Sequence, residues 1–131
     1  MTESAGRTWT LALPYERPPL SLNSRMHYRK EAQWKRQIKD DVQWLARLHR
    51  LPKNDLRRVL IQLVWTPSVK RPRDTDNPTA TLKPAIDGLV AYGLVPDDNK
   101  DIVESGCIIR EVVPHRGALE LVITEIVFDS P

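Results

Sequence analysis

The chain has 131 residues and a formal net charge of +3, a length that allows one compact domain and excludes two ordinary ones. No run approaches the roughly 18 apolar residues of a membrane span, and the N-terminus lacks a signal-peptide pattern, so we expect a soluble, cytoplasmic, single-domain protein over residues 1–131. The charge is uneven, because residues 1–73 hold 16 Lys/Arg and 6 Asp/Glu whereas residues 74–131 hold 4 and 11.

This asymmetry suits a protein that attracts phosphates with one surface and gathers carboxylates on another. A solvated surface with uneven charge explains the same counts equally well. Cys107 is the single cysteine, which excludes an intrachain disulfide and a thiolate metal cluster. Its apolar neighbours predict a small buried side chain.

The first half of the chain predicts a strand, a loop and a helix. Residues 8–13 alternate in polarity and end at Pro14, which indicates a short strand. Residues 14–28 are rich in Pro, Ser and Asn and lack periodicity, as a loop does. Residues 30–49 place apolar side chains near a 3.6-residue period, which predicts a helix that Pro52 stops.

The next elements are a strand, a polar loop and a second helix. Residues 57–66 form a β-branched, apolar run that predicts a central strand, and residues 68–77 are too polar for a core element. Apolar spacing predicts a helix over residues 81–92, with Gly93 where a C-terminal cap belongs. Pro84 should lie in its first turn, because an interior proline costs about 3 kcal/mol or more.

Residues 102–113 and 118–128 are apolar, β-branched runs separated by Pro-His-Arg-Gly, which predicts a hairpin. The order β-α-β-α-β-β predicts an α+β fold: a single domain with one mixed sheet of about four strands and two main helices packed on it.

Carboxylates gather in two loops. Asp74 and Asp76 are two residues apart just past a strand end, so in extended backbone their side chains point the same way. Asp97 and Asp98 follow the second helix, and three or four such carboxylates could surround one or two Mg²⁺ ions. The alternative is that Asp76 and Asn77 cap the helix and residues 97–99 form a plain turn. For an isolated Asp-x-Asp this alternative is favoured, because such spacing is common by chance.

A carboxylate-bound cation serves phosphodiester hydrolysis, because it lowers the pKa of its bound water, and a second ion about 4 Å away can stabilise the leaving oxygen. Lys83 and Asp87 are four residues apart on the second predicted helix. Lys83 could stabilise charge on the phosphate, with Asp87 orienting it or joining the metal site. Alternatively, and equally well, Lys83 and Asp87 form a surface ion pair that contributes about 0.3 to 0.5 kcal/mol to stability and has no catalytic role.

Basic residues flank these loops and are candidates for DNA contacts. They mix with His27 and Tyr28 in the first loop, as phosphate or base contacts would, although a solvated loop explains them as well. The four tryptophans favour core or dimer packing over DNA stacking. The candidate DNA-binding residues are Arg25, Arg29, Lys30, Lys70, Arg71 and Arg73.

Three motifs, in order, resemble the RusA family of Holliday junction resolvases of phages and prophages. They are residues 73–77 (RDTDN), 83–89 (KPAIDGL) and 95–98 (VPDD). The opening residues 13–14 and 18–25 and the closing residues 119–125 are also similar, so the resemblance covers nearly the whole chain. About three extra residues, near 79–81, and the adjacent aspartates 97 and 98 depart from the family pattern.

The resemblance implies a homodimer that binds four-way junctions in DNA recombination and repair and makes paired symmetric nicks with Mg²⁺ or Mn²⁺. It implies that Asp74, Asp76 and Asp98 are essential metal ligands and that Lys83 is the essential lysine, while Asp87 matches a further helix aspartate. Two-fold symmetry would offer one site to each of the two equivalent strands of a junction.

Two other functions stay open. One keeps the metal site but cleaves flaps or other branched DNA, and the other is a DNA-binding module whose carboxylates are structural. The first predicts a different substrate preference. The second predicts that Asp74→Asn changes no activity.

Overall fold

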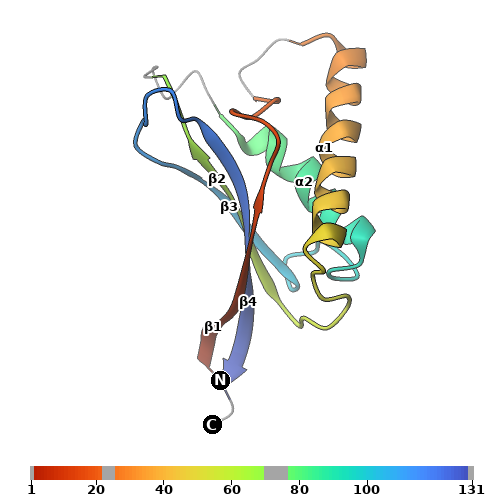
Figure 1. Ribbon diagram of the computed structural model, residues 1–131. Coiled ribbons are helices and arrows are strands. Elements are labelled where there is room, and N and C mark those ends of the chain that lie inside the picture. Colours follow the sequence, from red (N-terminus) through yellow and green to blue (C-terminus); the bar gives the residue numbers. More distant parts are fainter. Residues whose placement is uncertain (1, 22–25, 70–76, 130–131) are drawn as a thin grey trace.

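The computed structural model describes residues 2–21, 26–69 and 77–129, and it confirms an α+β fold with one sheet and two helices in the expected order. Both helices lie on one side of the sheet (Figure 1). Neither helix in these ranges is long and apolar enough to cross a membrane. The elements are β1 (Thr2–Ala12), α1 (Tyr28–Leu48), β2 (Val59–Thr66), α2 (Thr79–Tyr92), β3 (Val103–Ile109) and β4 (Ala118–Asp129).

The sheet has the order β1-β4-β2-β3. β2 is central, as predicted, and pairs in parallel with β3 and antiparallel with β4. The predicted hairpin between the last two strands is wrong, because β3 and β4 lie on opposite sides of β2. The chain reaches β3 from β2 through α2, and such a crossover is what joins parallel neighbours.

The connection between β3 and β4 follows the end of β2 instead of turning back. The Arg110 N–H donates to the Trp65 carbonyl oxygen over 2.8 Å, and the Val113 N–H donates to that of Pro67 over 2.9 Å. β3 itself ends at Ile109, whereas the sequence predicts a strand that continues to residue 113.

The core lies between the sheet and the helices. Alternate residues of β2 and β4, the end of β1 and every fourth residue of α1 are buried, in keeping with the periods of strands and helices. These side chains are Leu11 on β1, Val59, Ile61, Leu63 and Trp65 on β2, Leu119, Leu121 and Ile123 on β4, and Ile38, Val42 and Ala46 on α1.

β1 is longer than the predicted residues 8–13, because it pairs with β4 from Thr2 onward. β2 covers β4 only as far as Glu125, so the ends of β1 and β4 project as a two-stranded ribbon that carries both chain termini (Figure 1). Residues 2–8 are exposed, so they show no apolar alternation from which a strand could be predicted.

α1 begins at Tyr28, two residues earlier than predicted. His27 precedes its first turn, and the His27 Nδ1 accepts a hydrogen bond from the Arg29 N–H over 3.2 Å. Tyr28 and Arg29, expected in the loop, therefore belong to the helix. The helix ends at Leu48, and the left-handed backbone of Arg50 (φ 53°) follows it before Pro52 is reached.

α2 begins at Thr79, so Pro84 lies inside the helix and not in its first turn. The predicted start at residue 81, with Pro84 in the first turn, is therefore wrong. The predicted C-terminal cap is confirmed, because Gly93 has a φ of 101° and its N–H donates to the carbonyl oxygens of Leu89 and Val90.

The two helices meet at Gly88. A Cβ atom at this position would lie 2.6 Å from the Lys39 carbonyl oxygen and 3.0 Å from the Val42 Cβ. Glycine therefore lets α2 approach the backbone of α1 closely, and most of α2 is buried as a result.

Two side chains are more exposed than predicted. Cys107 is half-buried against the core, because it lies on the edge strand β3. Trp44 is 56% exposed on the outer side of α1, whereas Trp9 and Trp34 pack against the core and Trp65 is inside it.

Candidate catalytic and metal-binding site

Three charged side chains from two segments meet beside α2, and we call them the Lys83 cluster: Lys83, Asp87 and Asp98. The Lys83 Nζ lies 3.3 Å from Asp87 Oδ1, four residues along the same helix. It also donates a hydrogen bond to Asp98 Oδ2, from the connection between α2 and β3. The side chains are 64%, 44% and 33% exposed, respectively, so a substrate or ion in solution can reach them.

The turn before β3 directs Asp98 toward Lys83. The Asp97 Oδ1 accepts a hydrogen bond from the Asp98 N–H over 2.8 Å, and the Asp97 Oδ2 accepts one from the Asn99 side chain over 3.2 Å. The Asn99 Oδ1 in turn accepts from the Asp101 N–H over 3.0 Å. Asp97 therefore builds the turn, while Asp98 is the member of the pair that joins the cluster.

The ion pair shifts the pKa values of both partners. The hydrogen bond to Asp98 raises the pKa of Lys83, and Asp87 adds to this effect. The hydrogen bond from Lys83 lowers the pKa of Asp98. Each shift favours the charged form of its group, so the ion pair holds Lys83 as an ammonium and Asp98 as a carboxylate.

Lys83 reaches this position although extra residues precede it. Residues 79–81, where the sequence departs from the RusA pattern, form the start of α2. Asn77 prepares this start, because its side-chain Oδ1 accepts the Thr79 N–H over 3.0 Å. The N-cap residue is Pro78, so Asn77 supports the helix from one position before the cap, and Asp76 lies outside the described residues.

Several predicted site residues lie outside the described residues, namely Arg25, Lys70, Arg71, Arg73, Asp74 and Asp76. Arg29 and Lys30 are described and lie exposed on the first turn of α1. Within residues 2–21, 26–69 and 77–129, no three His, Cys, Asp or Glu side chains group in a way that could hold a metal ion. The described part of the candidate metal site therefore consists of carboxylates from Asp87 and Asp98.

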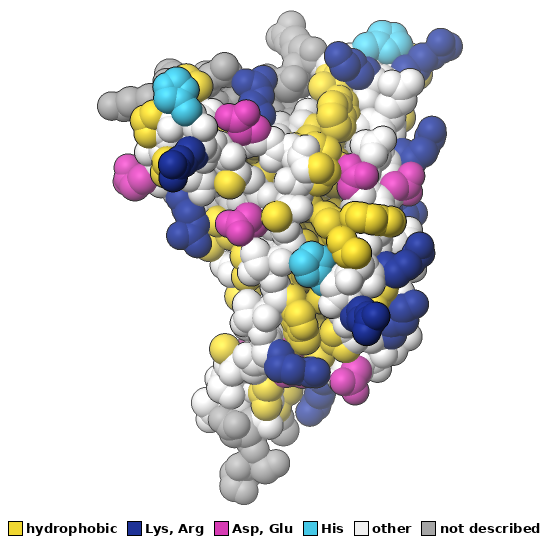
Figure 2. All heavy atoms as spheres, viewed as in Figure 1, with side chains coloured by type: hydrophobic (Ala, Val, Ile, Leu, Met, Phe, Trp, Pro, Cys, Tyr) yellow, Lys and Arg dark blue, Asp and Glu magenta, His cyan; other side chains and the backbone are white. Residues whose placement is uncertain are grey.

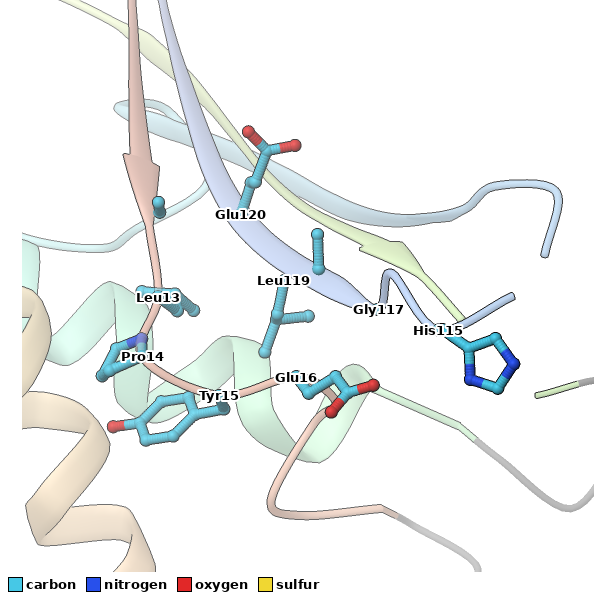
Figure 3. Close-up of a pocket in the computed structure, with 10 residues that line it drawn as sticks. Leu13, Pro14, Tyr15, Glu16, His115, Gly117, Leu119 and Glu120 are labelled. Atoms are coloured by element: carbon cyan, nitrogen blue, oxygen red, sulfur yellow. The ribbon is translucent and has the colours of Figure 1, made fainter. Parts of the chain in front are cut away.

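A separate cavity of about 450 Å³ opens between the end of β1 and the start of β4. Figure 3 shows Glu16 and His115 on loops and Glu120 on β4. None of the Lys83 cluster lines this cavity, so it is separate from the candidate site.

Thr81 is a structurally important residue that the sequence did not reveal. It is fully buried near the start of α2. The signal was its place on the apolar stripe shared with Ala85, Gly88 and Tyr92, where a hydroxyl must find a buried partner.

No protein-family model matches the chain, and no curated protein matches it significantly. The similarity to the RusA family therefore rests on the motifs of the sequence.

Proposed function

We propose that this protein is a Mg²⁺-dependent endonuclease that resolves four-way DNA junctions by paired nicks. The observation that carries this proposal is the Lys83 cluster. Asp98 lies 15 residues from Lys83 in the sequence, yet its carboxylate accepts a hydrogen bond from the Lys83 ammonium. Residues from two of the three RusA-like motifs thus come together at one exposed point.

The donor chemistry fits a hard divalent cation. Asp87 and Asp98 offer only oxygen atoms, and Mg²⁺ prefers a few carboxylate oxygens and retains water in its other positions. We propose that Asp74, Asp76 and Asp98 hold the ion, with Asp87 and Asp97 as further candidates and Mn²⁺ as a substitute. The ion would supply Lewis-acid activation of water and of the scissile phosphate.

Lys83 has a role that follows from its charge. Its ammonium is exposed and lies against two carboxylates, and the hydrogen bond to Asp98 raises its pKa further in favour of the charged form. We propose that its ammonium stabilises the negative charge that develops on the phosphate. Between turnovers it offsets the repulsion between Asp87 and Asp98, which keeps the site charged and assembled.

The DNA contacts are proposed for basic side chains around the site and on α1. α1 carries six Lys/Arg and three Asp/Glu, and Figure 2 shows Lys and Arg along the margin that α1 forms. Such positive charge favours phosphate binding without base specificity. A homodimer would present two such sites, one for each strand to be cut.

Cleavage of a synthetic mobile four-way junction tests the proposal. The wild-type protein is incubated with Mg²⁺ or EDTA and with junction, flap or linear duplex DNA. Paired nicks on the junction in Mg²⁺ alone are the expected result. Preferred cutting of the flap would instead indicate a broader branched-DNA nuclease, and binding without metal-dependent cutting of any substrate would indicate a DNA-binding module.

Two variants separate binding from cutting. Asp74→Asn and Asp98→Asn should lose cleavage while junction binding is kept or strengthened, because removing a carboxylate lessens repulsion of the phosphates. Asp101→Asn is the matched control. It lies exposed in the same turn as Asp98, and its carboxylate makes no ion pair with the described residues, so its cleavage rate should equal that of the wild type.

A further inference from the structure

The Thr81 side chain, near the start of α2, forms hydrogen bonds with both backbone groups of Leu20. The Thr81 Oγ1 accepts a hydrogen bond from the Leu20 N–H over 3.1 Å and donates one to the Leu20 carbonyl oxygen over 2.8 Å. Thr81 is fully buried and Leu20 nearly so. One hydroxyl thus satisfies both backbone groups of a buried residue, and each would be costly to leave unpaired.

The segment that reaches Thr81 is anchored at further points, and we call residues 13–21 the strap. At one end the Leu13 N–H donates to the Leu119 carbonyl oxygen on β4 over 2.9 Å. The Tyr15 hydroxyl donates to the Asp41 carboxylate on α1. At the other end the strap contacts the start of α2, because the Ser21 Oγ accepts the Asn77 N–H over 3.0 Å.

Pro84 explains why this start of the helix needs support from outside. Proline has no N–H, so the carbonyl oxygen of Ala80, four residues before Pro84, lacks its usual helical donor. The residues from Thr79 to Lys83 are therefore held within α2 by fewer helical hydrogen bonds than the rest of the helix. Lys83 is the last residue of this weakened turn, directly before Pro84.

We propose that Thr81 is a positioning residue, which locks the weakened first turn of α2 to the strap and so holds the Lys83 ammonium against Asp98 and Asp87. This inference rests on the proposed nuclease function, because it names what keeps the same site assembled. The strap would then act on the site through α2. A displacement of about 1 Å in a positioned group can cost roughly 100-fold in rate, so the clamp bears directly on turnover.

A pair of substitutions at Thr81 tests the inference. Thr81→Val keeps the shape and removes the hydroxyl, whereas Thr81→Ser keeps the hydroxyl. In Thr81→Val we expect kcat for junction cleavage to fall roughly 10- to 100-fold while the Kd for the junction is unchanged. Thr81→Ser should retain most of the wild-type kcat. A variant that merely lost stability would lower the active fraction and would leave kcat per folded molecule unchanged.

Amide hydrogen exchange on the metal-free protein gives a second readout that needs no activity. Exchange should accelerate in Thr81→Val at Leu20 and at residues 79–83, and not at the Gly93 end of α2. Wild-type exchange and wild-type kcat in a folded Thr81→Val protein would overturn the inference. Faster exchange with unchanged kcat would also overturn it, because the clamp would then be structural alone.

Failure of the nuclease proposal would be visible separately, because the wild-type protein itself would then cut no DNA. Should Thr81→Val fail to fold, Thr81→Ala takes its place, since it also removes the hydroxyl that bonds both backbone groups of Leu20. A lower kcat with unchanged junction Kd would support the inference. Unchanged kcat would overturn it.

Discussion

Replacing Lys83 with methionine should lower the cleavage rate strongly while leaving the fold nearly intact. The Lys83 side chain is 64% exposed, so solvent screens its ion pairs. The pair with Asp87, four residues along the helix, contributes about 0.3 to 0.5 kcal/mol, and an exposed pair such as that with Asp98 contributes about 0 to 1 kcal/mol. Lys83→Met should therefore lower the free energy of unfolding by roughly 1 kcal/mol.

The same substitution should cost far more in catalysis. Removing one preorganised group that stabilises transition-state charge typically lowers kcat by about 100- to 1,000-fold. A loss of about 1 kcal/mol cannot produce this effect by unfolding, because single domains are stable by about 5 to 15 kcal/mol. The rate and the stability should thus separate clearly.

The assay is single-turnover cleavage of a four-way junction with saturating Mg²⁺, together with urea denaturation of each protein. Lys100→Met is the control, because Lys100 is exposed in the neighbouring turn and makes no ion pair with the residues that the structure describes. Its rate should match the wild type. Cleavage by Lys83→Met within a few-fold of wild type would refute the assignment of Lys83 to the reaction.

Three further predictions follow from the contacts of single side chains. The pKa of Asp98, measured by NMR titration, should lie below its ordinary value of 3.8 and return toward it in Lys83→Met; the pair thus adds stability above the unfolded pKa and loses it as pH falls through the lower folded pKa. Gly88→Ala should destabilise the fold by about 1 to 3 kcal/mol, because its Cβ would lie 2.6 Å from a backbone oxygen of α1. Gly106→Ala, with no atom within 4 Å of the new Cβ, should leave the urea midpoint unchanged, and equal effects of the two would contradict this packing. Tyr92→Phe should cost about 1 to 3 kcal/mol in the same assay, because the hydroxyl donates to a buried backbone carbonyl.

The sequence predicted the elements whose signal is local. β2 is mostly apolar and β-branched because it is central, and the apolar stripe of α1 follows directly from its single buried face. Gly93 marked the end of α2 because a left-handed cap favours glycine. The pairing of Lys83 with Asp87 was likewise readable, since four residues span one helical turn.

The errors concern choices that depend on distant residues. β3 and β4 are both β-branched runs, and the sequence between them is typical of a turn. The same pattern is compatible with a β3–β4 hairpin and with β3 and β4 pairing on opposite sides of β2, which is what the sheet shows. Pro84 could not be placed from propensity alone, because the hydrogen bonds of Thr81 to Leu20 support the turn before it. Neither the strap nor Thr81 carries a sequence motif from which this contact could be predicted.

Residues 97–99 can form a structural turn and also place a candidate site residue, as the Lys83 cluster illustrates. Residues 97–99 fit a plain turn, and they do form one through the side chains of Asp97 and Asn99. That turn is also what directs Asp98 to Lys83. A substitution that breaks it, such as Asp97→Ala, would therefore act on Asp98 through the backbone, without Asp97 having to bind a metal. The sequence alone cannot distinguish Asp97 from Asp98 as the candidate ligand, because both are carboxylates. In the structure Asp97 bonds within the turn, whereas Asp98 bonds to Lys83.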